Sequence, residues 1–406
     1  MRTGRTAIVI GGGVVGVTSA HALARDGWSV RILDRCERPA EGASQGNGGQ
    51  LSYGYASAGG TPALLRQMPG LLFGAGDAFR MSLLGRDGYW RWLARFVREC
   101  LPAASRRNTL ALVQLAEESR AAMEHLLSQH PIEFGLERAG KLVILPDDPA
   151  VRAARNSVEA KRAAGVDLKV INAKEACEVE PALRTTGAPF AGATYIPGDN
   201  SGDCARFCEG LLGYSQAEYG TEFRAGVSVE RIESKRVGAL VTLDGGEVLE
   251  CDLAVVATGE AARELLAPLG HAIPIQPMKG YSFTAPLGQH APLVAISDID
   301  RRLVFTHRGD RMLVAGIAEL GRVDTRVDQV RLEAMIAAAR ASLPEAALYD
   351  EADGGWAGLR PMTPDSQPIT RMLEPNIAVN AGHGMLGWTL AMGSAERLAA
   401  AARDAV

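Results

Sequence analysis

The sequence lacks an apolar run of about 18 residues, so we expect no segment that crosses a membrane. It also lacks a basic stripe. The net charge is -4, and the lysines and arginines are scattered along the chain, which argues against nucleic acid as a partner. The first expected strand begins close to Met1, which leaves no room for a signal peptide. These absences predict a cytoplasmic protein.

Cysteine is scarce, and its spacing does not suit a metal site. The chain has 6 cysteines and no Cys-x-x-Cys pair. Cys204 and Cys208 are four residues apart, but the sequence offers no two further ligands near them. We therefore expect reduced thiols, as in a reducing cytosol, and no metal ion.

Apolar residues are plentiful, at 47% of a 406-residue chain, so we expect a large core and two domains. Strands at 6–10 and 29–33, with a helix at 17–25 between them, predict a β-α-β unit that begins a parallel sheet. The other expected elements are helices at 64–126, 151–164, 204–218, 327–342 and 389–404, and strands at 140–145, 192–196, within 227–257 and within 276–317.

A glycine-rich turn lies between the first strand and the first helix. Gly11, Gly13 and Gly16 have the G-x-G-x-x-G spacing, in which the first glycine permits the turn, the second lets a pyrophosphate approach, and the third lets helix and strand pack closely. Asp34 ends the second strand, where a carboxylate accepts hydrogen bonds from ribose hydroxyls and repels a 2′-phosphate. The turn therefore predicts a dinucleotide site; the alternative is a glycine-rich turn without a ligand.

The G-x-G-x-x-G spacing, the dinucleotide-binding fingerprint, does not by itself separate FAD from NAD, but two further features favour FAD. Residues 252–259 (DLAVVATG) form an expected strand that runs into a Thr258-Gly259 turn, as in flavoproteins of the glutathione-reductase type. The chain also has only one fingerprint, whereas an enzyme that reduces its flavin with NAD(P)H usually needs a second nucleotide site.

Five segments carry a resemblance to a known family. Beside the fingerprint they are 44–55 (SQGNGGQLSYGY), 277–282 (PMKGYS), 356–365 (WAGLRPMTPD) and 382–389 (GHGMLGWT). The chain resembles the FAD-dependent amine and amino-acid oxidoreductases related to D-amino acid oxidase and sarcosine oxidase, and within them the bacterial D-amino acid dehydrogenase small subunits. The loop near 53–63 and the segment 306–308 depart from those dehydrogenases, which leaves the amino acid used open.

The resemblance implies an α/β fold, with a glutathione-reductase-type FAD-binding Rossmann domain and an interleaved α+β substrate domain built on an antiparallel sheet. We expect residues 1–60, 150–275 and 355–406 to form the FAD-binding domain. Residues 61–149 and 276–354 would then form the substrate domain.

The resemblance also implies which residues hold a non-covalent FAD. The expected cofactor-binding residues are Gly11, Gly13, Val14, Val15, Gly16, Asp34, Arg35, Ser44, Asn47, Gly48, Gly49, Gln50, Leu51, Val227, Thr258, Gly259, Arg360, Gly384, Met385, Leu386, Gly387, Trp388 and Thr389. In the turn before the last helix, we expect the backbone around His383 to matter more than its imidazole, because backbone N–H groups there favour negative charge on the flavin.

The implied reaction moves a hydride from the Cα of an amino acid to flavin N5 and leaves an imine, which water hydrolyses to a keto acid. Arg360 is the candidate for the substrate carboxylate, because a guanidinium offers a planar, bidentate fork. Tyr281 is a second candidate, with a core role as the alternative. Tyr53 and Tyr55 are candidates for the pocket wall, and His307 for the polar end of the substrate, with a structural role as its alternative.

The leading hypothesis is a D-amino acid dehydrogenase, whose substrates include imino acids such as D-proline or D-hydroxyproline, and which passes electrons to quinone or a partner acceptor. One alternative is an oxygen-using oxidase of glycine, sarcosine or a similar amine. Another is the catalytic subunit of a heteromeric opine or hydroxyproline dehydrogenase. Residues 89–100 (YWRWLARFVREC) indicate either a helix that touches the inner membrane face or an ordinary surface helix.

Overall fold

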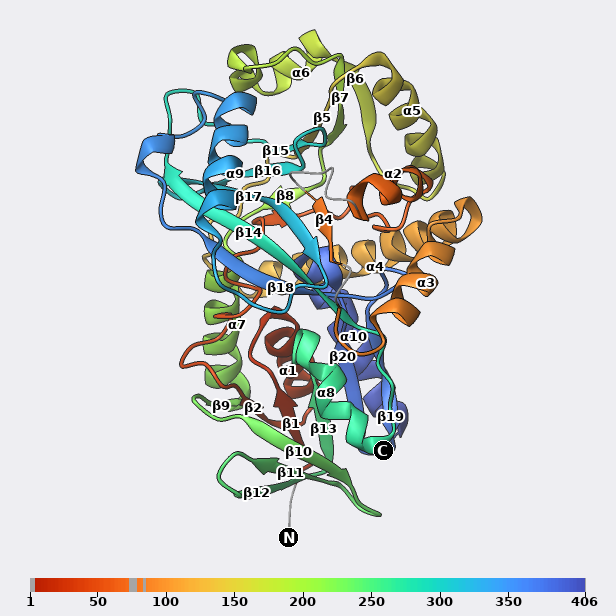
Figure 1. Cartoon of the computed structure of the whole chain (residues 1–406). Helices are drawn as coiled ribbons and strands as arrows, with labels where there is room; N and C mark the ends of the chain where they lie inside the picture. The colour runs from red at the N-terminus through yellow and green to blue at the C-terminus, as the bar shows by residue number, and fades with distance from the viewer. Residues whose placement is uncertain (1–3, 73–78, 83–84, 406) are drawn as a thin grey trace.

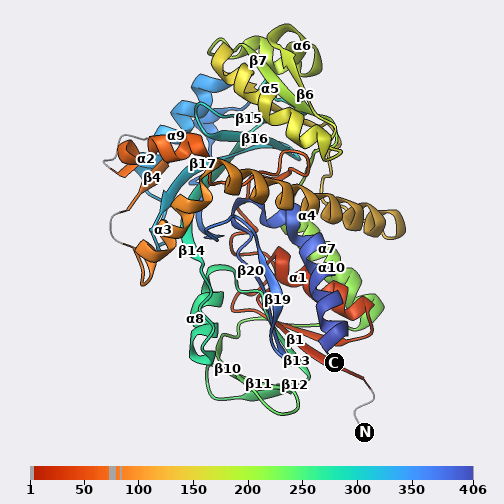
Figure 2. The ribbon, with the colours of Figure 1, turned by 90° about the vertical axis from the view of Figure 1, so that its right-hand side faces the viewer.

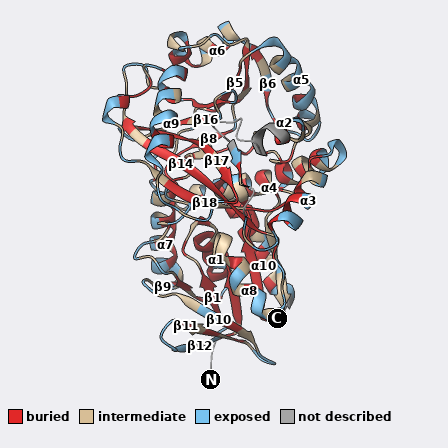
Figure 3. Ribbon diagram, in the orientation of Figure 1, coloured by how far each residue is buried: buried red, intermediate tan, exposed pale blue. Residues whose placement is uncertain are grey.

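In the computed structural model, which describes residues 4–72, 79–82 and 85–405, two large β-sheets lie at opposite ends of an elongated molecule (Figure 1). One sheet has six strands and the other nine. Strands of both sheets are buried, whereas the outer helices expose one face to solvent (Figure 3). The expected α/β fold is confirmed.

The six-stranded sheet contains the predicted β-α-β unit. In spatial order its strands are β19 (Ile369–Glu374), β20 (Ile377–Ala381), β13 (Leu253–Val256), β1 (Thr6–Ile10), β2 (Ser29–Leu33) and β9 (Glu222–Arg224). All neighbours pair in parallel except β19 and β20. The central strands are apolar on both faces because both faces are covered. This sheet is of the expected Rossmann type.

Helices cover one face of this sheet, and a small sheet covers the other. The helices are α1 (Val14–Arg25), α7 (Cys204–Tyr219) and α10 (Gly387–Ala405), with α4 (Pro102–Gln129) packed on α10 (Figure 2). The other face packs on β10 (Val229–Ser234), β11 (Ala239–Leu243), β12 (Val248–Cys251) and α8 (Ala262–Leu266). Along β1, Ala7 and Val9 therefore join the helix side, and Ile8 and Ile10 the small-sheet side.

The nine-stranded sheet is antiparallel except for the pairs β15–β5 and β17–β4. Its strands are β18 (Trp356–Met362), β14 (Gln276–Pro286), β17 (Arg311–Leu320), β16 (Leu303–Arg308), β15 (Ala295–Asp298), β5 (Lys141–Leu145), β7 (Gly192–Ile196) and β6 (Lys169–Asn172), with β4 (Phe79–Met81) beside β17. Helix α9 (Gln329–Ser342) packs on one face. The surrounding helices are α2 (Pro62–Leu72), α3 (Tyr89–Glu99), α5 (Asp148–Ala163) and α6 (Ala173–Val179).

Two details of the sequence prediction differ from the structure. Residues 150–196 were assigned to the FAD-binding domain, but β6 and β7 pair within the nine-stranded sheet, so we propose a boundary near residue 200 instead of 150. The helix expected at 64–126 is divided into α2, α3 and α4, and β4 interrupts it. Residues 73–78 and 83–84 of that prediction lie outside the described part of the chain.

Candidate functional site

Two of the three fingerprint glycines, Gly11 and Gly16, are required by the space around them. Gly11 has φ +106°, and a Cβ there would lie 2.6 Å from the Ala257 carbonyl oxygen. A Cβ on Gly16 would overlap the Gly11 carbonyl oxygen, so α1 and β1 pack this closely only with glycine. A Cβ on Gly13 would meet only Ser44 Oγ, at 3.3 Å. The backbone at Gly13 is therefore open on the side where a pyrophosphate would approach.

Helix α1 begins at this turn without a side-chain cap, so its first N–H groups are available to an anion. Val14 N–H donates to Ser44 Oγ at 3.0 Å. Because that oxygen accepts here, the Ser44 hydroxyl hydrogen is free to point at a phosphate oxygen. Val15 follows in the first turn of the helix.

Asp34 lies beside the turn, as predicted. Its carboxylate accepts from Gly12 N–H and from Cys36 N–H, the latter at 2.8 Å. Its backbone oxygen accepts from Val227 N–H at 2.9 Å, which brings that predicted residue to the same edge. Arg35 follows and is exposed. These residues occupy the carboxyl edge of β2, where an adenosine ribose would lie.

Thr258 and Gly259 complete this edge from β13, which pairs with β1. Thr258 Oγ1 is buried and has no hydrogen-bond partner among the described residues. Gly259 has φ +61°. A buried hydroxyl without a partner costs free energy unless a ligand satisfies it, so this site fits a bound nucleotide.

The loop 44–49 crosses from the turn to the nine-stranded sheet. Asn47 holds its shape, because Nδ2 donates to Ser44 O at 2.6 Å and Oδ1 accepts from Gly49 N–H at 2.7 Å. Ser282 Oγ donates to Gly46 O at 3.0 Å, and Thr306 Oγ1 donates to Gly48 O at 2.6 Å. The loop therefore lies on one particular face of the sheet.

Arg360 lies on that same face. It pairs with Met278 across β18 and β14, so it shares a face with Gly280 and Ser282. Its guanidinium packs directly over Gly280, where a Cβ would displace it. It forms no hydrogen bond or ion pair with a described residue, and burial lowers its pKa to about 10. Arg360 is thus a desolvated cation beside loop 44–49, and an anionic ligand would offset the cost of its burial.

The structure does not bring Tyr281 or His307 to this face. Successive residues of a strand point to opposite faces, so Tyr281 lies opposite Gly280, and His307 opposite Thr306. Tyr281 is buried in the core under α9, and its hydroxyl donates to Glu319 Oε2 at 3.2 Å. Burial raises its pKa. This geometry favours the core role that was the alternative for Tyr281.

Tyr53, Tyr55 and Gln50 follow the loop. Tyr53 is fully buried, its hydroxyl has no partner among the described residues, and burial raises its pKa. The pKa of Tyr55 is also raised by burial. Gln50 and Leu51 form β3, which pairs with β8 (Asn200–Ser201), and Gln50 Oε1 accepts from Lys141 Nζ at 2.7 Å. Lys141 had no sequence signal, because an isolated lysine in a strand resembles any other.

The turn before α10 closes the site from the C-terminal end. Gly382 and Gly384 have φ +84° and +57°, and a bridge between Met362 and His383 ties the turn to β18. Residues 384–386 form a short 3₁₀ helix that leads into α10 at Gly387. Thr389 Oγ1 accepts from Ser52 N–H at 3.0 Å. The turn, Arg360 and segment 44–52 are therefore joined.

The side chains of this turn have separate roles. His383 Nε2 bonds to Ser394 Oγ at 2.9 Å, away from the loop, and burial lowers its pKa to about 3. Trp388 packs its ring edge against Phe134, and its Nε1–H has no partner among the described residues. Met385 is exposed. Sequence reasoning missed Trp356, whose ring lies directly against Gly46 of the loop.

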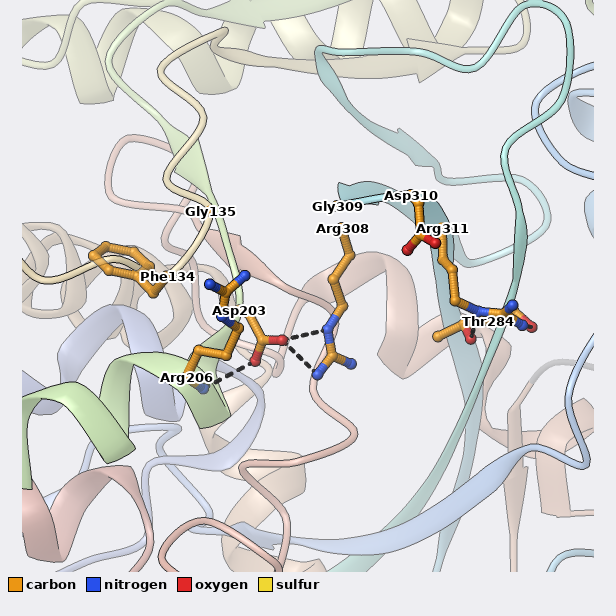
Figure 4. A pocket seen from close by; sticks show the side chains of 9 residues that line it. All are labelled: Phe134, Gly135, Asp203, Arg206, Thr284, Arg308, Gly309, Asp310 and Arg311. Carbon is orange, nitrogen blue, oxygen red and sulfur yellow. Dashed lines mark hydrogen bonds and ion pairs between the residues drawn. The ribbon is translucent and has the colours of Figure 1, made fainter.

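A separate cavity of about 310 Å³ is lined by residues of β14, β16, β17 and the start of α7 (Figure 4). Arg308 reaches across it to Asp203, which also caps α7, while Arg311 bonds to Thr284. Thr284 is four residues from Gly280, or about 13 Å along β14, with the Ser282 contact between them. This cavity is therefore distinct from the space around Arg360.

Comparison with known proteins agrees with this geometry. Residues 6–401 match the family described as FAD dependent oxidoreductase (DAO). The chain belongs to this family of FAD-dependent oxidoreductases. As in the sequence prediction, its cofactor is FAD, and the residues described above fit it: a Gly-rich turn open at Gly13, an uncapped helix start and an unsatisfied Thr258 hydroxyl.

Curated relatives of this FAD-dependent oxidoreductase are named D-amino acid dehydrogenase. One from Ralstonia nicotianae is 35% identical over 404 residues, covering 96% of this chain and 95% of the relative. One from Dechloromonas aromatica is 36% identical, with coverage of 97% and 95%. Among solved structures, glycine oxidase from Geobacillus kaustophilus has a TM-score of 0.76 at 22% identity, covering 98% of this chain and 95% of that one.

The described residues lack a membrane-spanning helix and a cluster of metal-binding side chains. None of the helices in residues 4–72, 79–82 and 85–405 is both long and apolar enough to cross a bilayer. Within the same ranges, no three His, Cys, Asp or Glu side chains gather as a metal ion would need.

Proposed function

We propose that this FAD-dependent oxidoreductase is a D-amino acid dehydrogenase that oxidatively deaminates its substrate to a keto acid. D-Proline or D-hydroxyproline would be substrates of the same kind. The names of the curated relatives at about 35% identity support the activity. The observation that carries the proposal is Arg360, a desolvated cation without a partner on the sheet face covered by the flavin-binding loop.

Arg360 would bind the substrate carboxylate. A guanidinium forms two parallel hydrogen bonds with a carboxylate, which fixes the orientation of the substrate as well as its position. The neutral backbone of Gly280 lies beneath the guanidinium and leaves room for it. The ion pair that forms would relieve the cost of burying Arg360 alone.

FAD, when bound, supplies the hydride acceptor for the Cα–H bond. The chain holds the substrate carboxylate at Arg360 and so orients the Cα–H bond toward the hydride acceptor. The turn at 384–386 and the start of α10 would hold the pyrimidine edge of the flavin. The positive end of the α10 dipole there favours the reduced, negatively charged state.

The flavin would be held without a covalent bond. Segment 44–55 and the turn 384–389 contain no cysteine and no histidine. His383, next to the turn, is hydrogen-bonded to Ser394 inside the core. Covalent attachment at these segments therefore has no suitable side chain.

The electrons would pass to quinone or a partner acceptor at the inner membrane face. The predicted aromatic face of α3 is corrected by the structure: Trp92 is buried and donates to the Pro274 and Met362 carbonyls. Trp90 is 57% exposed, and Arg91, Arg95 and Arg98 are exposed beside it without ion pairs to described residues. This basic face with one tryptophan fits an anionic lipid surface.

Anaerobic bleaching of the flavin absorbance tests the activity without assuming an acceptor. We expect D-amino acids, but not their L-enantiomers, to bleach the purified holoenzyme. Bleaching by L-amino acids alone would contradict the proposal. Hydrogen peroxide formed in stoichiometric amounts under air would make the chain an oxidase, and bleaching that required added subunits would make it part of a heteromeric enzyme.

A further inference from the structure

A charged cluster is buried between the two sheets, next to the flavin-binding loop. Lys141, Lys161 and Asp199 are 3%, 4% and 1% exposed. They come from β5, from α5 and from the turn after β7, and they surround segment 50–55. Lysine and aspartate are rarely this buried, since removing a charge from water is costly unless it is paired.

Each charged group of the cluster contacts segment 50–55. Lys141 Nζ donates to Gln50 Oε1 at 2.7 Å and to Ser52 Oγ at 2.9 Å. Lys161 Nζ donates to Gly54 O at 3.0 Å, and Asp199 Oδ1 accepts from Gly54 N–H at 2.7 Å. The ring of Tyr55 lies 4.3 Å from Lys141 Nζ and 5.4 Å from Lys161 Nζ.

The cluster carries excess positive charge at neutral pH. Burial lowers the pKa of both lysines to about 8 and raises the pKa of Asp199 to about 6. Between these values both lysines are protonated and Asp199 is ionised, which leaves one positive charge in excess. Tyr53 and Tyr55 face the cluster with raised pKa values and stay neutral. Behind Tyr53, Arg120 lies between Glu117 and Glu124 on α4.

Lys141 is one hydrogen bond away from segment 50–52 and two hydrogen bonds away from the start of α10, and both segments would hold the flavin. Gln50 and Ser52 continue the loop 44–49, and Ser52 N–H donates to Thr389 Oγ1 in the first turn of α10. A positive charge at this depth acts over a longer range than at the surface, because little water screens it.

We propose that Lys141, supported by Lys161 and Asp199, is a positioning residue that holds Gln50 and Ser52 in place and supplies a buried positive charge that favours reduction of the flavin. Reduction adds negative charge to the flavin, and a nearby fixed cation stabilises that state more than the oxidised one. The proposal rests on the proposed function only in that a flavin is reduced in this site.

The test uses the purified holoenzyme and its Lys141→Met variant. We expect Lys141→Met to retain FAD but to shift the flavin midpoint potential to more negative values, as measured by redox titration with dithionite and indicator dyes. Bleaching by substrate should slow several-fold with little change in KM. Lys141→Arg keeps a positive charge, so its midpoint potential should lie close to that of the wild type.

The pH dependence gives a second readout. In the wild type, the midpoint potential should fall more steeply with pH near 8, where the cluster loses its excess charge, and this step should be smaller in Lys141→Met, in which only Lys161 still titrates. Lys169→Met is the matched control, because Lys169 is an exposed lysine on β6 of the same sheet. It should leave the potential and its pH profile unchanged.

An unchanged potential in Lys141→Met with full FAD content would overturn the proposal. If Lys141→Met fails to fold, Lys161→Met carries the test, because it removes one positive charge from the same cluster, and an unchanged potential in Lys161→Met would overturn the proposal. The dithionite titration needs no amino acid, so it gives its answer even if no D-amino acid bleaches the flavin. Failure of the proposed function is thereby distinguishable from failure of this inference.

Discussion

Arg360 carries a positive charge that no described side chain neutralises. Its replacement should therefore weaken substrate binding and leave FAD binding unchanged. We expect Arg360→Lys to raise KM about thirtyfold, because the loss of a bidentate, charge-assisted contact costs about 2 kcal/mol. Steady-state kinetics with an artificial electron acceptor measure this, and the flavin spectrum reports FAD content.

Arg206 offers a matched control for Arg360. It lines the separate cavity at Asp203 and Arg308, which Arg360 does not line. Arg206→Lys should leave KM unchanged. A raised KM in Arg206→Lys together with normal kinetics in Arg360→Lys would place the substrate in that second cavity.

At the residue scale, the sequence predicts which residue types surround the flavin better than which face they occupy. Arg360 and Gly280 share a face because of the register between β14 and β18, and that register is a non-local pairing. Tyr281 and His307 were chosen for their chemistry, yet each is one residue out of phase with the loop-facing side. Lys141 could be identified only from the structure, which places β5 beside segment 50–55.

At the start of α1, the two glycines should respond differently to alanine. Gly16→Ala would force the Cβ onto the Gly11 carbonyl, so we expect about 3 kcal/mol or more of lost stability or no folded protein. Gly13 has φ -71°, which alanine adopts freely, so Gly13→Ala should fold with near-normal stability. Its methyl group would occupy the space of the pyrophosphate and weaken FAD binding about tenfold or more.

Thermal unfolding of the apoproteins and FAD titration separate the two effects. Equal FAD affinity in Gly13→Ala and the wild type would contradict the placement of the pyrophosphate over Gly13.

The exposed face of α3 makes a prediction at the same scale. Arg91→Glu with Arg95→Glu and Trp90→Ala should abolish flotation with vesicles that contain anionic lipid, because the basic and aromatic groups act together at such a surface. Bleaching of the flavin by substrate should stay normal, since this face lies outside the site.

The control for α3 reverses two exposed arginines outside this helix, Arg236→Glu after β10 and Arg371→Glu on β19. It should float like the wild type. Equal flotation of the α3 variant and the wild type would remove the membrane contact from the proposal.

Strand positions near the fingerprint were predicted well because the local sequence marks where these strands end. Strand β1 is an apolar run that ends just before Gly11, and β2 is apolar at Val30, Ile32 and Leu33 and ends just before Asp34, so local composition marks both ends. Strand β4 has three residues and exists because it pairs with β17, more than 200 positions away. No local pattern marks such a strand, and the prediction gave helix there.

The stability of the whole molecule should fall on mild acidification. Burial lowers the pKa of His21 to about 4 and that of His383 to about 3. As the pH falls below about 6.5, the unfolded chain takes up these protons first, so each histidine should cost about 2 kcal/mol of stability at pH 5. Above pH 6.5 this contribution is constant.

Thermal unfolding at pH 7 and pH 5 measures this loss. His383→Gln should reduce the drop between the two pH values, since glutamine keeps a donor for Ser394 but does not titrate. His125→Gln, at an exposed position on α4, should not change it. An equal drop in all three proteins would contradict the role of His383.

At the scale of the molecule, the sequence predicts two interleaved parts but not where they exchange. The boundary near 150 was an expectation drawn from the family resemblance. The pairing of β6 and β7 with β5 extends the nine-stranded sheet by about 50 residues, and α4 packs on α10 of the other part. Both contacts join segments that are distant in sequence, so no local sequence pattern predicts them.

Helix α10 completes the nucleotide site that the glycine-rich turn after β1 begins. Because α10 packs against α1 and its leading turn faces segment 44–52, the nucleotide site is incomplete until α10 has been synthesised. The nascent chain therefore has to keep its glycine-rich turn uncovered until then, and cofactor loading follows the synthesis of α10. A premature stop codon before residue 383 would then yield a chain that collects no flavin, however well its first 380 residues fold.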